Sequence, residues 1–284
     1  MRWRARIILS LLPLLASCSA LRLTYDQGPL LAYWWLDSYA DFSPEQAPRM
    51  KRALADWFDW HRATQLGDYA QALSTMQAMA VNPVTAAQAC NLAEGWQRRA
   101  ELAFDRAVPA LAETARSLTI EQISHIERRQ RVKQEDLVAE YLQPDPAERQ
   151  KAALERTIDR AESIYGRLDE SQRRLLAGAL LISPFDARLW LAERRQRQAD
   201  LVQSLRRWHA ERSDADTVQS GLRRLAADTT RSPRPEYAAY AARLAQANCA
   251  LAAQLHNSTT AAQRQRAVDR LQAWEADLRA LAAP

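Results

Sequence analysis

Glycine is scarce in this chain, with 6 residues in 284, and this scarcity restricts the fold more than any other feature. Tight turns and strand irregularities use glycine, and short β-branched runs with a period of two, the signature of strands, are missing. Ala, Leu, Arg, Gln and Glu dominate instead, and these are strong helix formers. The sequence therefore predicts an all-α protein, a multi-helix bundle of long amphipathic helices.

Proline-containing breaks at 82–85, 143–146, 182–186 and 231–235 divide the chain into segments. A short aromatic segment comes first, and each later segment opens with a helix-start signal or follows a break. We expect the helices to cover 30–39, 43–64, 68–79, 86–116 with a bend at Pro109, 119–142, 146–166, 169–181, 183–212, 214–229, 236–256 and 260–281.

One type of helix start recurs along the chain. Its three copies are Phe42-Ser43-x-x-Gln46, Leu118-Thr119-x-x-Gln122 and Leu168-Asp169-x-x-Gln172. Each fits a capping box, in which the first side chain accepts from the backbone N–H of the third helical residue and the Gln side chain reaches back. No repeat of fixed period accompanies these starts.

The first eighteen residues resemble a bacterial lipoprotein signal. Three arginines precede an apolar run at 7–15, and Leu15-Ala16-Ser17-Cys18 is similar to a lipobox. The resemblance implies acylation of Cys18, cleavage before it and anchoring in a membrane, and Ser19 in place of Asp implies the outer membrane with the body in the periplasm. The alternative is an ordinary signal peptide with an unrelated cysteine.

These features suggest a signal peptide at 1–17, a lipidated tether at 18–28 and a helical periplasmic domain at 29–284. That domain forms either one bundle or two lobes that divide near 143–146. Removal of 1–17 takes away three arginines and lowers the formal net charge from +5 to +2. Acidic and basic residues are then interspersed, so we expect no nucleic-acid partner.

Cys90 and Cys249 are the cysteines that follow Cys18. An oxidising compartment favours a disulfide between them. Both lie in helical stretches beside apolar residues, so two buried free thiols are the alternative.

Catalytic and metal-binding signatures are missing from the sequence. None of the four histidines belongs to an HExxH or ExxH pair, and no GxSxG, GxGxxG or P-loop occurs, so we expect no catalytic residue, metal or cofactor. Aromatic clusters at 33–35 and 57–60 are typical of core, with a ligand groove as the alternative. Four arginine pairs are typical of solvated, ion-paired helix faces, with binding of an anionic lipid or glycan as the alternative: Arg128-Arg129, Arg194-Arg195, Arg206-Arg207 and Arg223-Arg224.

Two family resemblances follow from these motifs. Residues 31–46, 118–129 and 165–202 resemble a family of helical proteobacterial lipoproteins known only as a domain of unknown function, which implies the location and helical fold and adds no catalytic residue. The Leu118 start is also similar to the LTxxQ motif of Spy-like and CpxP-like periplasmic proteins, which are helical chaperones or sensors. Asp169, and Phe42 with Ser43, depart from that motif in the other two starts, and ordinary helix capping is the alternative to a shared origin or function for all three.

Three functions are consistent with these features. The first is a non-enzymatic binding or scaffold role toward an envelope protein, by an outer-membrane lipoprotein tethered through Cys18. The second is a Spy-like chaperone that binds unfolded client proteins. The third is an envelope hydrolase whose site is assembled from distant residues.

Overall fold

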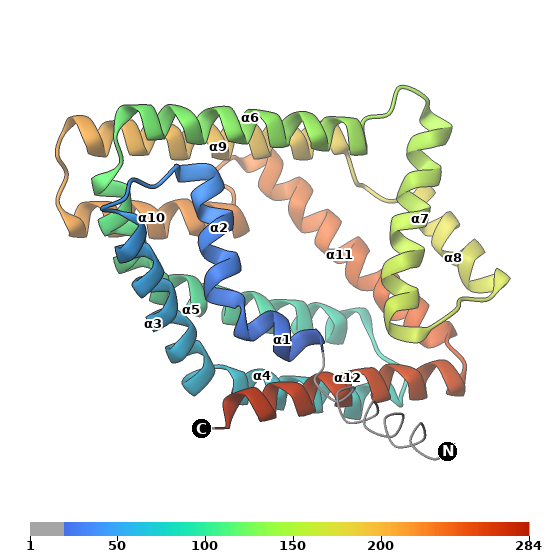
Figure 1. Ribbon diagram of the computed structural model, residues 1–284. Helices are drawn as coiled ribbons and strands as arrows, with labels where there is room; N and C mark the ends of the chain where they lie inside the picture. Colours follow the sequence, from blue (N-terminus) through green and yellow to red (C-terminus); the bar gives the residue numbers. More distant parts are fainter. Residues whose placement is uncertain (1–19, 284) are drawn as a thin grey trace, which may run out of the picture.

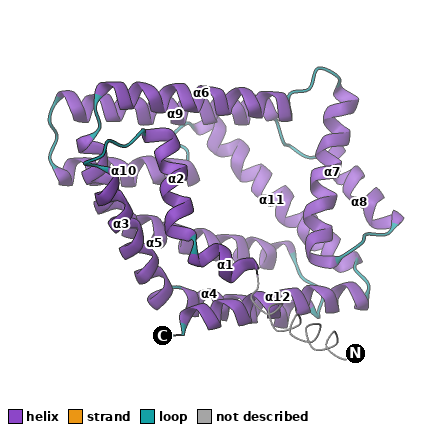
Figure 2. Cartoon of the chain, viewed as in Figure 1, coloured by secondary structure: helices purple, strands orange, loops and turns teal. Residues whose placement is uncertain are grey.

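The computed structural model describes residues 20–283, which form twelve helices and no strand (Figure 2). The signal peptide, the lipobox and Cys18 lie outside these described residues. The helices are α1 (Ala20–Asp26), α2 (Gly28–Ala40), α3 (Ala47–Thr64), α4 (Leu66–Ala80), α5 (Ala86–Ser117), α6 (Ile120–Tyr141), α7 (Pro146–Tyr165), α8 (Glu170–Leu181), α9 (Ala187–Ala210), α10 (Ala215–Thr230), α11 (Pro235–Ser258) and α12 (Ala261–Ala282). The all-α prediction is confirmed. None of these helices is both long enough and apolar enough to cross a bilayer.

Two segments differ from the expected helices. Residues 20–26, assigned above to the tether, form α1, which packs against α12 and α2. The helix expected from Ser43 begins at Ala47, because residues 43–47 close a tight turn in which the N–H groups of Gln46 and Ala47 donate to the carbonyl of Ser43. Pro109 lies inside α5, which continues through it to Ser117.

A similar arrangement of helices occurs twice. In the first half, α2 contacts α3 and α6, while α3 contacts α5. In the second half, α7 contacts α8 and α12, while α8 contacts α11. Helices α7, α8, α11 and α12 therefore take the places of α2, α3, α5 and α6.

The two halves pack on each other through two pairs of helices, and each pair has one helix from either half. Helix α4 packs along α12 and α9 packs along α6, which places one long pair at each end of the molecule (Figure 1). Helices α5 and α11 cross between these pairs, and α10 packs on α5 as well. The break at 143–146 thus separates α6 from α7 in a body whose halves remain in contact.

The largest core cluster lies where α5, α6, α9 and α10 meet. It includes Val108, Ile123 and Val218, which are fully buried, and Trp208. Gly221 of α10 faces that indole so closely that a Cβ at this position would lie 2.3 Å from Trp208 Cζ2. A smaller cluster around Leu168 and Leu176 holds α7, α8 and α11 together, and a third joins α4 to α12.

Candidate functional site

Two of the recurring helix starts meet in space. The starts of α3 and α6 face each other, and the amides of Gln46 and Gln122 exchange hydrogen bonds, with Nε2 to Oε1 distances of 3.2 and 2.7 Å. Gln46 Nε2 also donates to the carbonyl of Ser117 (2.8 Å), and Gln122 Nε2 donates to the carbonyl of Asp41 (2.8 Å). Each acceptor lies two residues before the partner's cap, so the junctions are joined reciprocally.

The same reciprocal hydrogen bonding recurs in the second half, between the starts of α8 and α12. The amides of Gln172 and Gln263 exchange bonds of 2.7 and 2.9 Å, and they donate to the carbonyls of Ser258 (3.1 Å) and Arg167 (2.9 Å). Each Oε1 also accepts from the N–H of its own cap residue, Asp169 or Thr260. Both donors and the acceptor of each amide are therefore used, which explains how Gln172 tolerates complete burial.

These glutamine pairs connect one helix start to another by hydrogen bonds, and we call each connected pair of starts a joint. Thr119 and Asp169 accept from the N–H groups of Gln122 and Gln172, so ordinary capping is present at both positions. A hydrogen bond from the Ser171 hydroxyl and others from backbone N–H groups hold the pKa of Asp169 below its usual value. The apolar residues before the caps, Leu118 and Leu168, are buried.

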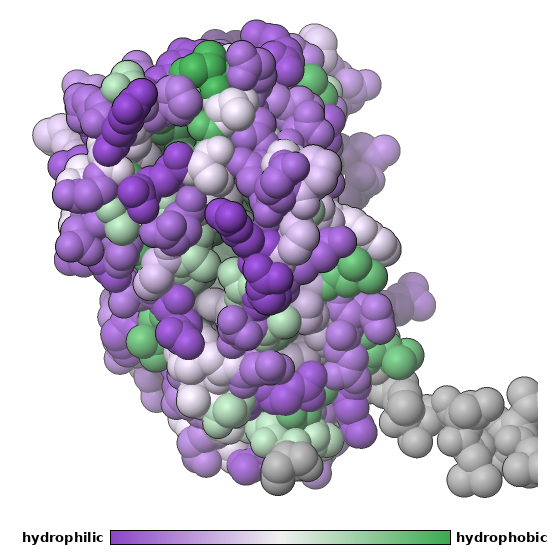
Figure 3. Space-filling model, turned by 60° about the vertical axis from the view of Figure 1, so that its left-hand side comes forward, coloured by the Kyte–Doolittle hydropathy of each residue, from purple (hydrophilic) through white to green (hydrophobic). Residues whose placement is uncertain are grey.

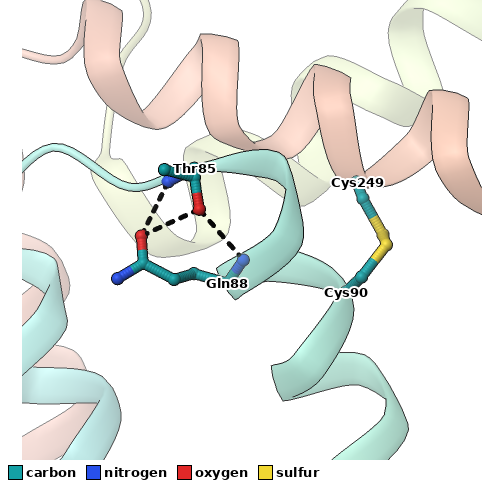
Figure 4. Close-up of a disulfide and its surroundings, with 4 residues drawn as sticks. All are labelled: Thr85, Gln88, Cys90 and Cys249. Carbon is teal, nitrogen blue, oxygen red and sulfur yellow. Dashed lines mark hydrogen bonds between the residues drawn. A yellow bond between two sulfur atoms is a disulfide. The ribbon is translucent and has the colours of Figure 1, made fainter.

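A further capping box, Thr85 with Gln88, lies beside the disulfide that joins Cys90 of α5 to Cys249 of α11 (Figure 4). Gln88 is exposed, and its Oε1 accepts from the N–H and the hydroxyl of Thr85. The disulfide spans 159 residues of sequence and links the two helices that cross at the centre.

The four histidines lie apart from one another, and each contacts an aromatic ring, a hydroxyl group or a backbone carbonyl. His61 stacks on Trp57 with ring centroids 4.7 Å apart, and its Nδ1 lies 2.8 Å from the hydroxyl of Tyr25. Burial lowers the pKa of His61 and raises the pKa of Tyr25 to about 12, so both groups are neutral near pH 7. Each of the other three contacts a backbone carbonyl, in the pairs His125–Ser38, His209–Leu118 and His256–Asn82. Within residues 20–283, no three His, Cys, Asp or Glu side chains are grouped as metal ligands.

Two of the four arginine pairs contain a side chain that forms an ion pair with a carboxylate, and the other two contain a buried Nε–H without a hydrogen bond. Arg206 binds Glu127 and Arg223 binds Asp105, both across helices. The Nε–H groups of Arg129 and Arg194 are buried and donate no hydrogen bond.

The most buried carboxylate among the ion pairs of the described residues is that of Glu193, and one of its two arginine partners is Arg234. With Ser232 and Arg197 it contacts Glu193 and holds the α10–α11 linker against α9. Burial alone would raise the pKa of Glu193, but the hydrogen bonds from Arg234 and Ser232 outweigh it and keep the pKa low.

Two shallow depressions lie on the described surface. One, of about 220 Å³, lies between α6 and α9 and is lined by Arg131, Gln134 and Arg195 among others. The second, of about 210 Å³, lies between α4 and α5 beside Trp96. Pockets for small-molecule ligands generally span 300 Å³ or more, so neither fits a ligand of ordinary size.

Large apolar side chains are exposed at several places on the described residues, and at two of them three or more lie close together in the sequence. The first, which we call the corner, is the α8–α9 loop, where Leu181, Ile182 and Phe185 are 66%, 86% and 41% exposed. The second, which we call the α1–α2 face, comprises the exposed side chains of Leu21, Leu23, Leu30, Leu31, Trp34 and Trp35. Trp34 and Trp35, expected above in the core, are therefore at the surface, while Tyr33 is buried. Elsewhere, the side shown in Figure 3 is mostly hydrophilic with small apolar spots.

The sequence interpretation missed the box at Thr260 and Gln263, although Thr260 was expected to begin a helix. The same cap-x-x-Gln spacing marks it, but a threonine precedes the cap where the other starts have Phe or Leu. The corner was missed because Ser183 and Pro184 read as a helix start, and a start signal does not say which side chains face solvent.

Comparison with known proteins gives the chain a family. No curated protein and no solved structure matches it. The model of a family of unknown function, DUF6279, matches residues 38–238, which is more than two thirds of the chain. The match runs from the end of α2 into α11 and includes the first glutamine pair and the corner. The chain therefore belongs to the DUF6279 family.

Proposed function

We propose that this protein is a non-enzymatic binding or scaffold protein of the cell envelope, and that the corner is its contact with a partner protein. The observation that carries the proposal is that Leu181 and Ile182, at 66% and 86%, are the two most exposed large apolar side chains of the described residues. Burial of such a side chain is worth about 1.5–3 kcal/mol, so a cluster of them at the surface favours association. The buried core of a protein interface is more apolar than the rest of the surface.

The corner is held in place by contacts on both sides of the loop. Asp186 caps α9 by accepting from the N–H groups of Arg188 and Leu189, and its own N–H donates to the hydroxyl of Tyr240 (3.0 Å). Phe185 contacts the rings of Tyr141 and Trp190. A loop fixed in this way presents its apolar residues in one conformation, which lowers the entropic cost of binding.

The place of action in this proposal is the periplasmic face of the outer membrane. The support is the lipobox-like Leu15-Ala16-Ser17-Cys18 behind an apolar run, with Cys18 as the acylated residue. Labelled palmitate tests this step. Wild type should incorporate it and Cys18→Ala should not, and incorporation by both would exclude Cys18 as the site.

Site-specific photo-cross-linking in cells tests the partner contact. A photoreactive phenylalanine at Ile182 should capture one dominant envelope protein, whereas the same group at Glu170, an exposed polar position at the start of helix α8, should not. Substitution of Leu181 and Ile182 by aspartate should abolish co-purification of that protein. Equal cross-linking from both positions, or from neither, contradicts the proposal.

The second candidate is a Spy-like chaperone, and the surface of α6 favours it. Val132 and Val138 are exposed on the same helix as Arg128 and Arg131, so apolar and cationic groups mix there as binding of unfolded chains requires. A chaperone would suppress aggregation of a denatured client and would cross-link to many proteins under unfolding stress. A single cross-linked partner at the corner excludes this candidate.

A further inference from the structure

The α1–α2 face is the most apolar surface among the described helices. It contains six of the exposed large hydrophobic side chains, including Trp34 and Trp35, which are 56% and 63% exposed. The remaining tryptophans of the described residues are buried or half-buried. Helix α2 has one charged residue, Asp37, whose carboxylate accepts from the N–H of Phe42. The face is thus a surface of leucine and indole without a free charge on α2.

Helices α1 and α2 follow one another along the chain and meet at a bend (Figure 1). The N–H of Gln27 donates to Leu23 O (3.2 Å), and the N–H of Leu31 donates to Gln27 O (3.0 Å), while Pro29 has no N–H to donate. At about 100° per residue, positions 30, 31, 34 and 35 fall on one side of α2, and Leu21 and Leu23 are exposed on α1. Tyr33 points to the other side and is buried.

Helices α1 and α2 are fixed to the body on the side opposite the α1–α2 face. Tyr25 hydrogen-bonds His61, and Arg62 pairs with Asp26 (2.8 Å). A second pair joins Arg22 to the buried carboxylate of Asp277 on α12 (2.8 Å). At the junction, Gly28 lies against the ring of Phe58, where a Cβ would lie 2.3 Å from Cε1. The orientation of the α1–α2 face relative to the body is therefore set by specific contacts.

The position of α1 in the chain, close to Cys18, indicates what covers the α1–α2 face. Helix α1 begins at Ala20, two residues after Cys18, and two residues span at most about 7 Å. A lipid on Cys18 would hold the start of α1 at the bilayer surface. Tryptophan favours the headgroup region, and amphipathic helices lie in its plane with leucine and tryptophan facing the acyl chains.

We propose that the α1–α2 face lies on the lipid bilayer, so that the anchor and the face together fix the orientation of the body at the membrane. This inference rests on the proposed anchor at Cys18, which supplies the proximity. If the test below shows no contact between this face and lipid, a protein partner or a second copy of the chain is the occupant left to consider.

Quenching of tryptophan by brominated lipid tests the contact directly. The lipidated protein is reconstituted into vesicles of phosphatidylethanolamine and phosphatidylglycerol, with or without brominated acyl chains. Brominated lipid should reduce the emission of wild type, and W34F/W35F should lose this quenched component while it stays bound through its lipid. W190F, which removes a half-buried indole of α9, is the matched control and should retain the quenched component.

The outcomes separate the face from the anchor. Equal quenching of wild type and W34F/W35F, or no quenching of vesicle-bound wild type, overturns the inference while palmitate labelling still supports the anchor. If wild type takes up no palmitate, the anchor fails, and the same assay on unlipidated protein mixed with vesicles decides whether the face binds lipid by itself. Circular dichroism should show unchanged helicity in both variants because the replaced rings in W34F/W35F are exposed.

Discussion

Replacement of Gln172 by glutamate distinguishes a buried joint from an ordinary helix start. At the third position of a helix, glutamate normally stabilises by about 0.3–1 kcal/mol through the helix dipole. Gln172, however, is 0% exposed, and its Nε2 donates to Ser258 O and Gln263 Oε1. A carboxylate cannot make these two bonds, and it faces two oxygen atoms without water.

The size of the effect follows from these contacts. Two lost bonds cost about 1–3 kcal/mol together, and the buried charge raises the loss to about 3–5 kcal/mol at pH 7. The glutamate should have a raised pKa in the folded state, so the folded protein holds a proton that the unfolded chain releases above about pH 4.3. Stability should then fall by about 1.4 kcal/mol per pH unit above that point, up to the folded pKa.

Gln88 provides the matched control because its box is exposed and its amide oxygen only accepts from Thr85. We expect Gln88→Glu to stay within about 0.5 kcal/mol of wild type, since a carboxylate preserves those bonds. Urea unfolding followed by circular dichroism at pH 4 and pH 7 measures both variants. Equal losses in the two variants, or a loss in Gln172→Glu that does not depend on pH, would refute the joint.

Three further expectations concern the body. Gly221→Ala should cost about 1–3 kcal/mol because its Cβ meets Trp208, whereas Gly178→Ala in α8, with open space at the Cβ, should stabilise by about 0.4–1 kcal/mol; urea unfolding compares them. Reduction of the disulfide, which closes 159 residues, should lower the unfolding free energy by up to about 5 kcal/mol, and unchanged unfolding under reducing conditions would contradict this. Burial lowers the folded pKa of His61, so the unfolded chain takes up the proton first and stability should decline as pH falls below about 6.5; His61→Phe should flatten this decline in a pH series of melting temperatures.

The helices were predictable because their signals are local. Thr119 and Asp169 cap the helices that their spacing predicted, and Thr85 and Thr260 cap helices at the same spacing. Residues 20–26 differ, because α1 is held by His61 and Asp277, which lie far away in the sequence. Helix formation there depends on packing that no local pattern encodes.

The joints and the exposed faces could not be predicted for a related reason. Gln88 and Gln172 have the same spacing from their caps, yet one is exposed and one is completely buried, since burial depends on whether a second glutamine arrives from a distant helix. Trp34 and Trp35 likewise fit an apolar helix, and the sequence does not say which side of it meets the body.

The packing of α4 along α12 also determines when this protein can finish folding. A ribosome releases the chain from its N-terminus, and α12 is the last of the described helices to appear. Until then, α4 lacks the leucine and tryptophan side chains that cover it, and Leu73 and Met76 remain open to other chains. The surface of α4 therefore stays uncovered until α12 packs on it, and a chain cut before α12 would leave that surface open to chaperones and proteases.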